Sequence, residues 1–142
     1  MEKFNLLDDI KLLCVKAGSF PAGIKPAHER LATVKKPDGK TNHYGISYLY
    51  DNEILYMAGL DITGTGENIP EGCEEYTLRK GTYISIYITD FAKDITQIEK
   101  AFKKILANPN IDENGCCAEC YLQEGTDFFT AKDMRCMVRL AD

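Results

Sequence analysis

The chain has 142 residues, with apolar residues at 44% and charged residues at 27%, which suits one globular domain that needs no metal or disulfide for its core. Its net charge is −5, and its basic residues gather only in short pairs such as Lys35-Lys36 and Lys103-Lys104, which argues against direct nucleic-acid binding. The charged start and the absence of any apolar run near ~18 residues predict a cytoplasmic protein without a membrane span.

The first unit, about residues 10–62, predicts in order a strand, a short helix and a β-hairpin. These elements are expected at 11–20, 26–36, 44–50 and 54–62. Pro26 suits the first turn of the helix, and Pro37-Asp38-Gly39 should end it. Asp51-Asn52 suits the hairpin turn. A Gly- and Thr-rich linker at 63–72 then separates this unit from the next.

The second unit, about residues 75–140, repeats that order more clearly. Ile84, Ile86 and Ile88 alternate with polar residues and predict a strand. Asp94 should be the N-cap of a helix. The expected elements are a strand at 81–89, a helix at 94–107, a strand at 116–122, a turn at Glu124-Gly125-Thr126 and a strand at 134–140.

Neither unit can close a core alone, so the two should pair into one antiparallel-rich sheet. We therefore predict an α+β fold of duplicated β-α-β-β units in one domain, 1–142. Both helices should cover one face of the sheet, and a ligand cleft should lie on the other. The side chains expected to line that cleft are Tyr83, Ser85, Tyr87, Cys117, Glu119 and Tyr121.

The strand around Glu119 carries the main functional signal. Side chains alternate along a strand, so Cys117, Glu119 and Tyr121 should share one face. A carboxylate among apolar groups has a raised pKa unless a cation or a donor compensates it. Such a group favours a cationic ligand or a proton-transfer role. A surface carboxylate on an edge strand is the alternative.

Several tyrosines could form an aromatic cage for a cation, because phenol faces attract positive charge. We expect Tyr83 and Tyr121 in the pocket, with Tyr48 and Tyr87 as further candidates beside Ser85. Packing of half-exposed strand faces is the alternative for each of them.

Metal and redox chemistry have weaker support. Cys117 and Cys120 form a C-x-x-C, but no second pair accompanies it and a strand would point the two thiols to opposite faces. We therefore expect no metal, no cofactor and no disulfide, with Cys117 retained as a candidate thiol on the face of Glu119. His28 and His43 lack a neighbouring nucleophile motif and are expected at the surface.

The order of motifs from Ile69 to Leu140 resembles the gyrase-inhibitor-like, or bacterial transcription effector-binding, family. An Ile-Pro-Glu-Gly turn leads to a Gly-Thr-Tyr-Ile strand, a helix, an Ala-Glu-Cys-Tyr strand and a Met-Arg-Cys-Met-Val strand. The resemblance implies a duplicated β-α-β-β fold whose central cleft binds small organic, often cationic and aromatic, molecules. It implies ligand contacts at Glu119 and Tyr121, and an aromatic position at Tyr83.

Residues and resemblance together predict a small-molecule-binding protein, a stand-alone effector-binding domain without a DNA-binding region. One alternative is a small hydrolase of the same fold in which Glu119 activates water on an electrophilic xenobiotic. A second is a protein-interaction role of gyrase-inhibitor type, and a protein partner or a homo-oligomer stays open. The sequence shows no nucleophile–base pair, which favours binding over catalysis.

Overall fold

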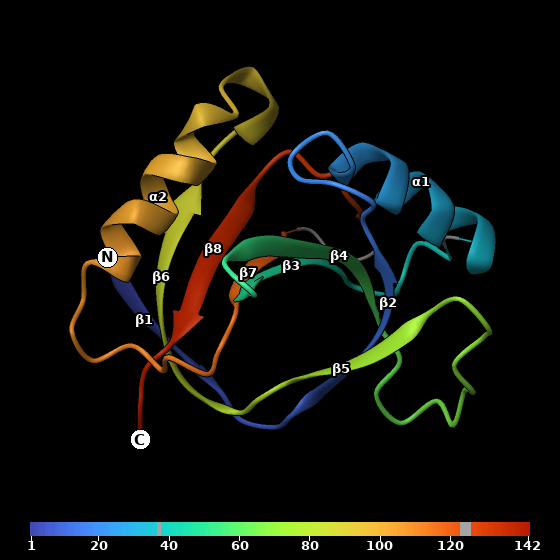
Figure 1. Ribbon diagram of the computed structural model, residues 1–142, viewed down its shortest axis with the longest axis horizontal. Helices are drawn as coiled ribbons and strands as arrows, with labels where there is room; N and C mark the ends of the chain where they lie inside the picture. Colours follow the sequence, from blue (N-terminus) through green and yellow to red (C-terminus); the bar gives the residue numbers. More distant parts are fainter. Residues whose placement is uncertain (37, 123–125) are drawn as a thin grey trace.

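The computed structural model describes residues 1–36, 38–122 and 126–142, which form an eight-stranded antiparallel sheet and two α-helices (Figure 1). The strands are β1 (Glu2–Leu6), β2 (Ile10–Lys16), β3 (His43–Tyr50), β4 (Glu53–Asp61), β5 (Glu74–Leu78), β6 (Gly81–Ile88), β7 (Cys117–Tyr121) and β8 (Met134–Arg139). The helices are α1 (Ile24–Val34) and α2 (Thr96–Leu106). Pro37 of the first predicted helix stop, and Glu124 and Gly125 of the predicted turn, lie outside the described residues.

The strand order reads as two similar halves that meet at the centre of the sheet. It runs β1-β6-β8-β7-β3-β4-β2-β5, and β7 pairs with β3 at the middle. The chain order β2-α1-β3-β4 thus returns as β6-α2-β7-β8. The α+β class and the duplicated order of elements are confirmed. The assignment of the whole chain to one small-molecule-binding domain stays a prediction.

Two edge strands were not expected from the sequence. β1 pairs with β6, and β5 pairs with β2, so each unit gains one outer strand. Both segments contain charged residues and expose many of their side chains. Natural edge strands carry charges that discourage pairing with other molecules, and these charges obscure the hydrophobic alternation that marks a strand. The missed strands are therefore the least buried strands of the sheet.

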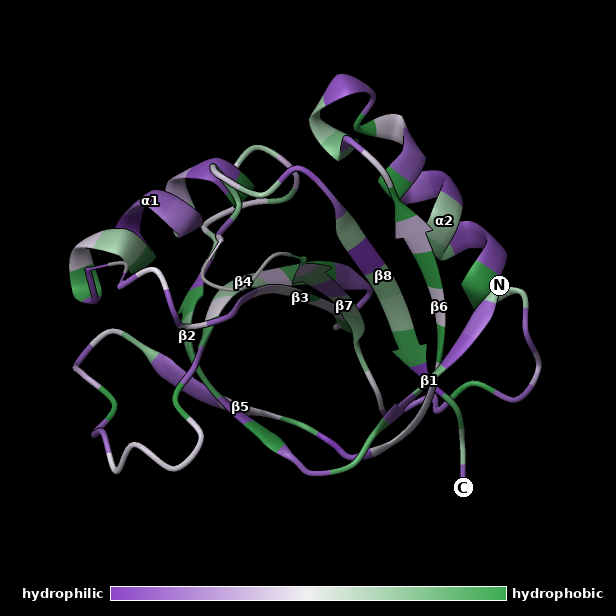
Figure 2. Cartoon of the chain, turned by 180° about the vertical axis from the view of Figure 1, so that it is seen from behind, coloured by the Kyte–Doolittle hydropathy of each residue, from purple (hydrophilic) through white to green (hydrophobic). Residues whose placement is uncertain are grey.

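Both helices cover the same face of the sheet, as predicted. α1 packs on β2 and β4, and α2 packs on β6 and β8, so that β3 and β7 lie between them. Figure 2 shows that the outer surfaces of both helices are largely hydrophilic, with apolar positions turned toward the sheet. The α2 core is built around Ile105 and Ala101, which pack against buried side chains of β6 and β8. We call this face the helix side and the opposite face the concave side.

Local signals set the turns and helix ends. Asp51 and Asn52 both have positive φ, 54° and 64°, which matches the two-residue hairpin turn expected there. α2 starts at Thr96 with Ile95 as its N-cap residue, so the predicted N-cap Asp94 lies one position too early; its carboxylate accepts a hydrogen bond from the Thr96 backbone N–H. No helix in the described part of the chain is long and apolar enough to cross a membrane.

The C-x-x-C pair is split by the sheet. Cys117 lies beside Val138, and Cys120 lies beside Arg135, so the two thiols point to opposite faces. All six cysteines are free thiols. Among the described residues, no group of three or more His, Cys, Asp and Glu side chains is placed to hold a metal ion. The expected lack of zinc and of disulfides stays a prediction.

The packing of α2 gives a direct test of the fold. Ile105 is fully buried, whereas the neighbouring Leu106 is 47% exposed. We expect Ile105→Ala to lower the free energy of unfolding by about 2–5 kcal/mol, because it leaves a cavity between helix and sheet. Leu106→Ala is the matched control and should change it by less than about 0.5 kcal/mol. Urea denaturation of both variants measures this, and equal losses would contradict the placement of α2.

Candidate functional site

Glu119 lies on the helix side, and the structure corrects the face expected for it. Residues paired across strands share a face, and Glu119 pairs with Cys136, which pairs with Ile86. Glu119 therefore shares the face of the isoleucines that pack toward α2. The predicted grouping of Glu119 with Tyr83 and Ser85 is wrong. Alternation within each strand was right, but the register between β6, β8 and β7 decides which faces coincide.

The seven predicted site residues divide between the two faces. Those on the helix side are Cys117, Glu119 and Tyr121, and those on the concave side are Tyr48, Tyr83, Ser85 and Tyr87. The structure brings only the first three together, so the predicted single cleft lining is not formed. Their individual roles in ligand binding stay predictions.

The concave-side hydroxyls are mostly engaged in structural contacts. Tyr83 is 1% exposed, and its hydroxyl donates to the Arg79 carbonyl. The Ser85 hydroxyl donates to the Glu2 carbonyl of β1. Tyr87 is exposed and donates to Asp133. These contacts fit strand packing better than a ligand cage.

The centre of the helix side holds a cluster of one carboxylate, two phenols and one imidazole, which we call the Glu119 cluster: Glu119, Tyr121, Tyr56 and His28. The Tyr121 hydroxyl donates to Glu119 Oε1 at 3.1 Å and lies 3.4 Å from the Tyr56 hydroxyl. His28 Nε2, from α1, lies 2.8 Å from the Tyr56 hydroxyl and 3.3 Å from that of Tyr121. The cluster thus connects β7, β4 and α1 by hydrogen bonds.

Gly45 makes room for this cluster. It pairs with Glu119 across β3 and β7, and a Cβ built at Gly45 would lie 2.3 Å from the Tyr56 hydroxyl and 2.9 Å from Glu119 Oε1. The missing side chain therefore lets the phenol and the carboxylate approach above the sheet. Tyr56 is 1% exposed and hydrogen-bonded, so it has little freedom to move aside.

Glu119 is a carboxylate without a cationic partner among the described residues. Its side chain is partly exposed, and the surrounding protein still removes much of the water from its carboxylate. Burial raises the pKa of Glu119 from 4.5 to about 7, against the lowering effect of the Tyr121 hydrogen bond. The pKa rises because loss of hydration favours the neutral, protonated acid over the carboxylate. At neutral pH the side chain is near its titration midpoint.

The other members of the Glu119 cluster stay neutral. Burial lowers the pKa of His28 to about 3, and the nearby His43 acts in the same direction. Burial, followed by the charge of Glu119, raises the pKa of Tyr121 and of Tyr56 well above the usual value. Glu119 is therefore the group of the cluster that changes charge near neutral pH.

The expected surface positions of His28 and His43 are wrong. His28 is 3% exposed and His43 4%, and the His28 ring stacks on Phe128 with 4.6 Å between centroids. The sequence contained a signal for His28, since it lies four residues after Ile24 and three before Leu31, at the margin of the apolar stripe of α1. Tyr56 and Gly45 had no such signal, because their roles depend on strand register.

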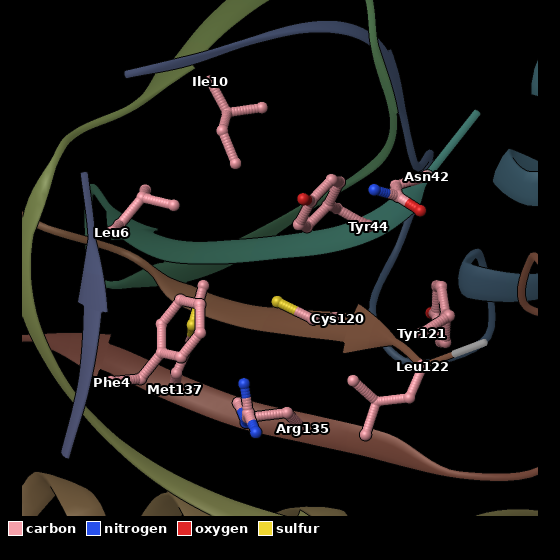
Figure 3. A pocket seen from close by; sticks show the side chains of 10 residues that line it. All are labelled: Phe4, Leu6, Ile10, Asn42, Tyr44, Cys120, Tyr121, Leu122, Arg135 and Met137. Atoms are coloured by element: carbon pink, nitrogen blue, oxygen red, sulfur yellow. The ribbon is translucent and has the colours of Figure 1, made fainter. Parts of the chain in front are cut away.

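Two hollows flank this region on opposite faces. One of about 430 Å³ lies on the helix side and is bounded by the 17–20 segment and by 53–56, including Tyr56 and Phe20. The other, of about 380 Å³, lies on the concave side (Figure 3). Of the predicted site residues its lining contains Tyr121 but not Cys117, Glu119, Tyr48, Tyr83, Ser85 or Tyr87.

Cys117 has little character of a reactive thiol. Burial raises its pKa to about 11, and Cys116 and Glu119 act in the same direction. A thiol reacts as the thiolate, so a raised pKa suppresses its reactivity. Cys117 therefore fits a packing role beside Ser47, its partner across β3.

Comparisons with solved structures show the fold. A Staphylococcus aureus MU50 protein, described provisionally as a bacterial transcription regulation protein, is 14% identical over 100% of this chain and 99% of its own, with a TM-score of 0.67. The protein SAV2435, solved with bound tetraphenylphosphonium, is 14% identical over 99% of this chain and 94% of its own, with a TM-score of 0.66. A hydrolase from Listeria innocua is 8% identical over 99% of this chain and 90% of its own, with a TM-score of 0.55.

Family models and curated protein sequences gave no match to this chain. The solved structures agree with the fold that the resemblance to the gyrase-inhibitor-like family implies, at identities near 14%. Since such identities show the fold alone, the chain is similar to these proteins in architecture and its function is inferred from its own residues.

The space at Gly45 can be tested by adding one methyl group. We expect Gly45→Ala to lower the free energy of unfolding by about 1–3 kcal/mol, because the Cβ collides with the buried Tyr56 hydroxyl. Gly59 on β4 is the matched control, since a Cβ there meets its nearest atom, Leu12 Cδ1, at an ordinary 3.4 Å. Chemical denaturation compares Gly45→Ala with Gly59→Ala. A Gly45→Ala protein as stable as the parent would contradict the described contact.

The raised pKa of Glu119 predicts a dependence of stability on pH. Between pH 4.5 and pH 7 the unfolded carboxyl has lost its proton while the folded one still holds it, so stability present at low pH falls as pH rises through about 7. A fully buried group would lose roughly 3 kcal/mol. We expect about 1–2 kcal/mol, because solvent reaches this side chain and screens it.

Glu119→Gln should remove this loss, which denaturation at pH 5 and pH 8 measures in parent and variant. The expected result is a smaller pH dependence in the variant and greater relative stability at pH 8. An unchanged pH dependence in Glu119→Gln would show that another group causes it.

Proposed function

We propose that the protein is a receptor for small organic cations, which bind over Glu119 between α1 and α2. The observation that carries this proposal is a partly exposed carboxylate in a dense, aromatic setting with no cationic partner among the described residues. A cation placed there supplies the missing charge and lowers the pKa of Glu119, so ligand binding and ionisation of Glu119 favour each other.

The aromatic residues near Glu119 fit the same ligand class. Tyr121 contacts the carboxylate directly, and Phe128 packs on Tyr121 with 6.3 Å between ring centroids. Phe20 packs on Tyr56 at 6.2 Å and is 42% exposed, and Phe129 is 46% exposed. Aromatic faces attract cations by about 0.5–2 kcal/mol each, more strongly where water is excluded. Exposed rings beside a partly buried carboxylate favour an aromatic or lipophilic cation.

A helix-side hollow of about 430 Å³ adjoins the Glu119 cluster through Tyr56, and Glu119 itself lies outside its lining. Small-molecule sites typically measure roughly 300–1,000 Å³. The structurally similar SAV2435 was solved with tetraphenylphosphonium, a lipophilic cation, which supports that class as the first probe for this protein.

Titration of tetraphenylphosphonium at pH 8 into parent and Glu119→Gln tests the proposal by calorimetry. We expect the variant to bind about ten- to a hundredfold more weakly, because it keeps the shape of the side chain and loses its charge. Glu113→Gln, at an exposed position, removes the same charge elsewhere and should bind like the parent.

The neutral triphenylphosphine oxide should bind more weakly than tetraphenylphosphonium to the parent. Affinity for the cation should also fall from pH 8 to pH 5.5, where Glu119 is protonated. Equal affinity of Glu119→Gln and parent, or no binding to the parent, would refute the proposal.

A second function, hydrolysis, has one specific observation in its favour. A carboxyl with a pKa of about 7 suits a general base at neutral pH, and the Tyr121 hydroxyl beside it can donate to a substrate oxygen. A similar fold is found in a Listeria innocua hydrolase. If Glu119→Gln keeps affinity for an activated ester but loses its turnover, the hydrolase replaces the receptor.

A further inference from the structure

We propose a second ligand site, on the concave side, that binds small organic anions with an apolar body through Arg135. The pocket of about 380 Å³ is built around Arg135 and Cys120, which share the sheet face opposite to Glu119, and Figure 3 shows its lining side chains. Its lining residues are Phe4, Leu6, Ile10, Asn42, Tyr44, Cys120, Tyr121, Leu122, Arg135 and Met137. Arg135 is the only charged side chain among these described lining residues.

Strand register builds the floor of this pocket. Arg135 of β8 pairs with Cys120 of β7, and Cys120 pairs with Tyr44 of β3. The three side chains therefore form one row across the sheet on the concave side. Phe4 from β1 and Ile10 from β2 stand over this row (Figure 3). The site is thus held by five strands, which gives it a rigid frame.

The guanidinium of Arg135 has no acceptor in the described part of the chain. Its Nε is buried without a hydrogen-bond partner, and no described carboxylate forms an ion pair with it. The arginines that do form ion pairs, Arg79 and Arg139, share Asp112 at the other end of β8. Leaving a buried donor unsatisfied is costly, so a site of this kind favours an acceptor from outside the chain.

The Phe4 ring orients the guanidinium. The Arg135 Cζ lies over the Phe4 ring, 4.7 Å from its centroid, so a cation–π contact holds the guanidinium plane in place. Hydrogen-bond donors project in that plane, where a carboxylate accepts from two N–H groups at once. A guanidinium held by an aromatic contact, with its buried Nε donor unpaired, fits recognition of a carboxylate.

The other polar groups of the pocket also donate. Burial raises the pKa of Tyr44 well above its usual value, so its hydroxyl keeps its proton and can donate. Asn42 is exposed at the pocket margin and contributes an amide N–H₂. With no acidic side chain among the described lining, the pocket selects anions although the protein as a whole has a net charge of −5.

The remaining lining is aliphatic or aromatic, so the ligand needs an apolar body. Leu6, Ile10, Leu122 and Met137 surround the polar row. We therefore assign the site to aromatic or aliphatic monocarboxylates. This class is opposite in charge to the cations proposed for Glu119, and the two sites lie on opposite faces of the sheet.

Calorimetric titration of 2-naphthoate, 2-naphthamide and 2-naphthylmethylammonium into the full chain tests the assignment, since the three probes share one apolar body. We expect 2-naphthoate to bind the parent most tightly. Arg135→Gln should weaken 2-naphthoate about ten- to a hundredfold, because a charge-assisted bidentate contact is lost. Lys104→Gln, on the exposed side of α2, removes the same charge elsewhere and should leave the affinity unchanged.

Asn42→Asp gives an independent variant at an exposed position, so it keeps the fold. It should weaken 2-naphthoate several-fold and leave 2-naphthamide unchanged. No binding of 2-naphthoate to the parent, equal affinity of parent and a folded Arg135→Gln, or equal affinity for naphthoate and naphthamide would each overturn the site. This test of the Arg135 site does not use tetraphenylphosphonium. Its outcome is therefore independent of whether a cation binds at Glu119.

Discussion

The hydrogen bond from Tyr121 to Glu119 is the interaction around which the helix side is organised. It holds a carboxylate on β7, at the centre of the sheet between the strands on which α1 and α2 mainly pack. Gly45 provides the space above β3, and Tyr56 and His28 extend the contacts to β4 and α1. Without this hydrogen bond, burial would raise the pKa of Glu119 further and favour a permanently neutral acid.

The sheet separates two environments of opposite charge preference. One central strand, β7, contributes Glu119 to the helix side and Cys120 to the concave side, next to Arg135. A shift of one residue in the register of β7 would place Glu119 on the concave side and Cys120 on the helix side. The duplicated strand order places both environments near the join of the two halves, where β7 and β3 pair. A single scaffold thereby offers a carboxylate on one face and a guanidinium on the other.

Much of the fold could be predicted because its signals are local. The alternation of Ile84, Ile86 and Ile88 and the apolar stripe of α2 both depend on short-range periodicity. Glu119 was identified for the same reason, since an acid within an apolar strand is visible in a few residues. The edge strands β1 and β5 were missed because their charged side chains hide the alternation.

The partners of Glu119 and Tyr121 in the site could not be predicted, because they depend on contacts between distant residues. Tyr56 and Tyr121 are 65 positions apart, and His28 and Tyr121 are 93 apart. Tyr83 and Glu119 were wrongly predicted to share a face of the sheet. The alternation within each strand was predicted correctly, but the register between the strands could not be known from the sequence. Gly45 acts by lacking a side chain, which no pattern in its own strand indicates.

The central claim is that Glu119 is a strongly desolvated carboxylate that a bound cation stabilises in its ionised form. Carbon-13 NMR of the glutamate side-chain carboxyls, with Glu119 assigned by its loss in Glu119→Gln, measures this directly. We expect Glu119 to have a pKa near 7 in the free protein and a markedly lower pKa when tetraphenylphosphonium is bound. A pKa near the ordinary 4.5 in the free protein, or one that tetraphenylphosphonium leaves unchanged, would contradict it.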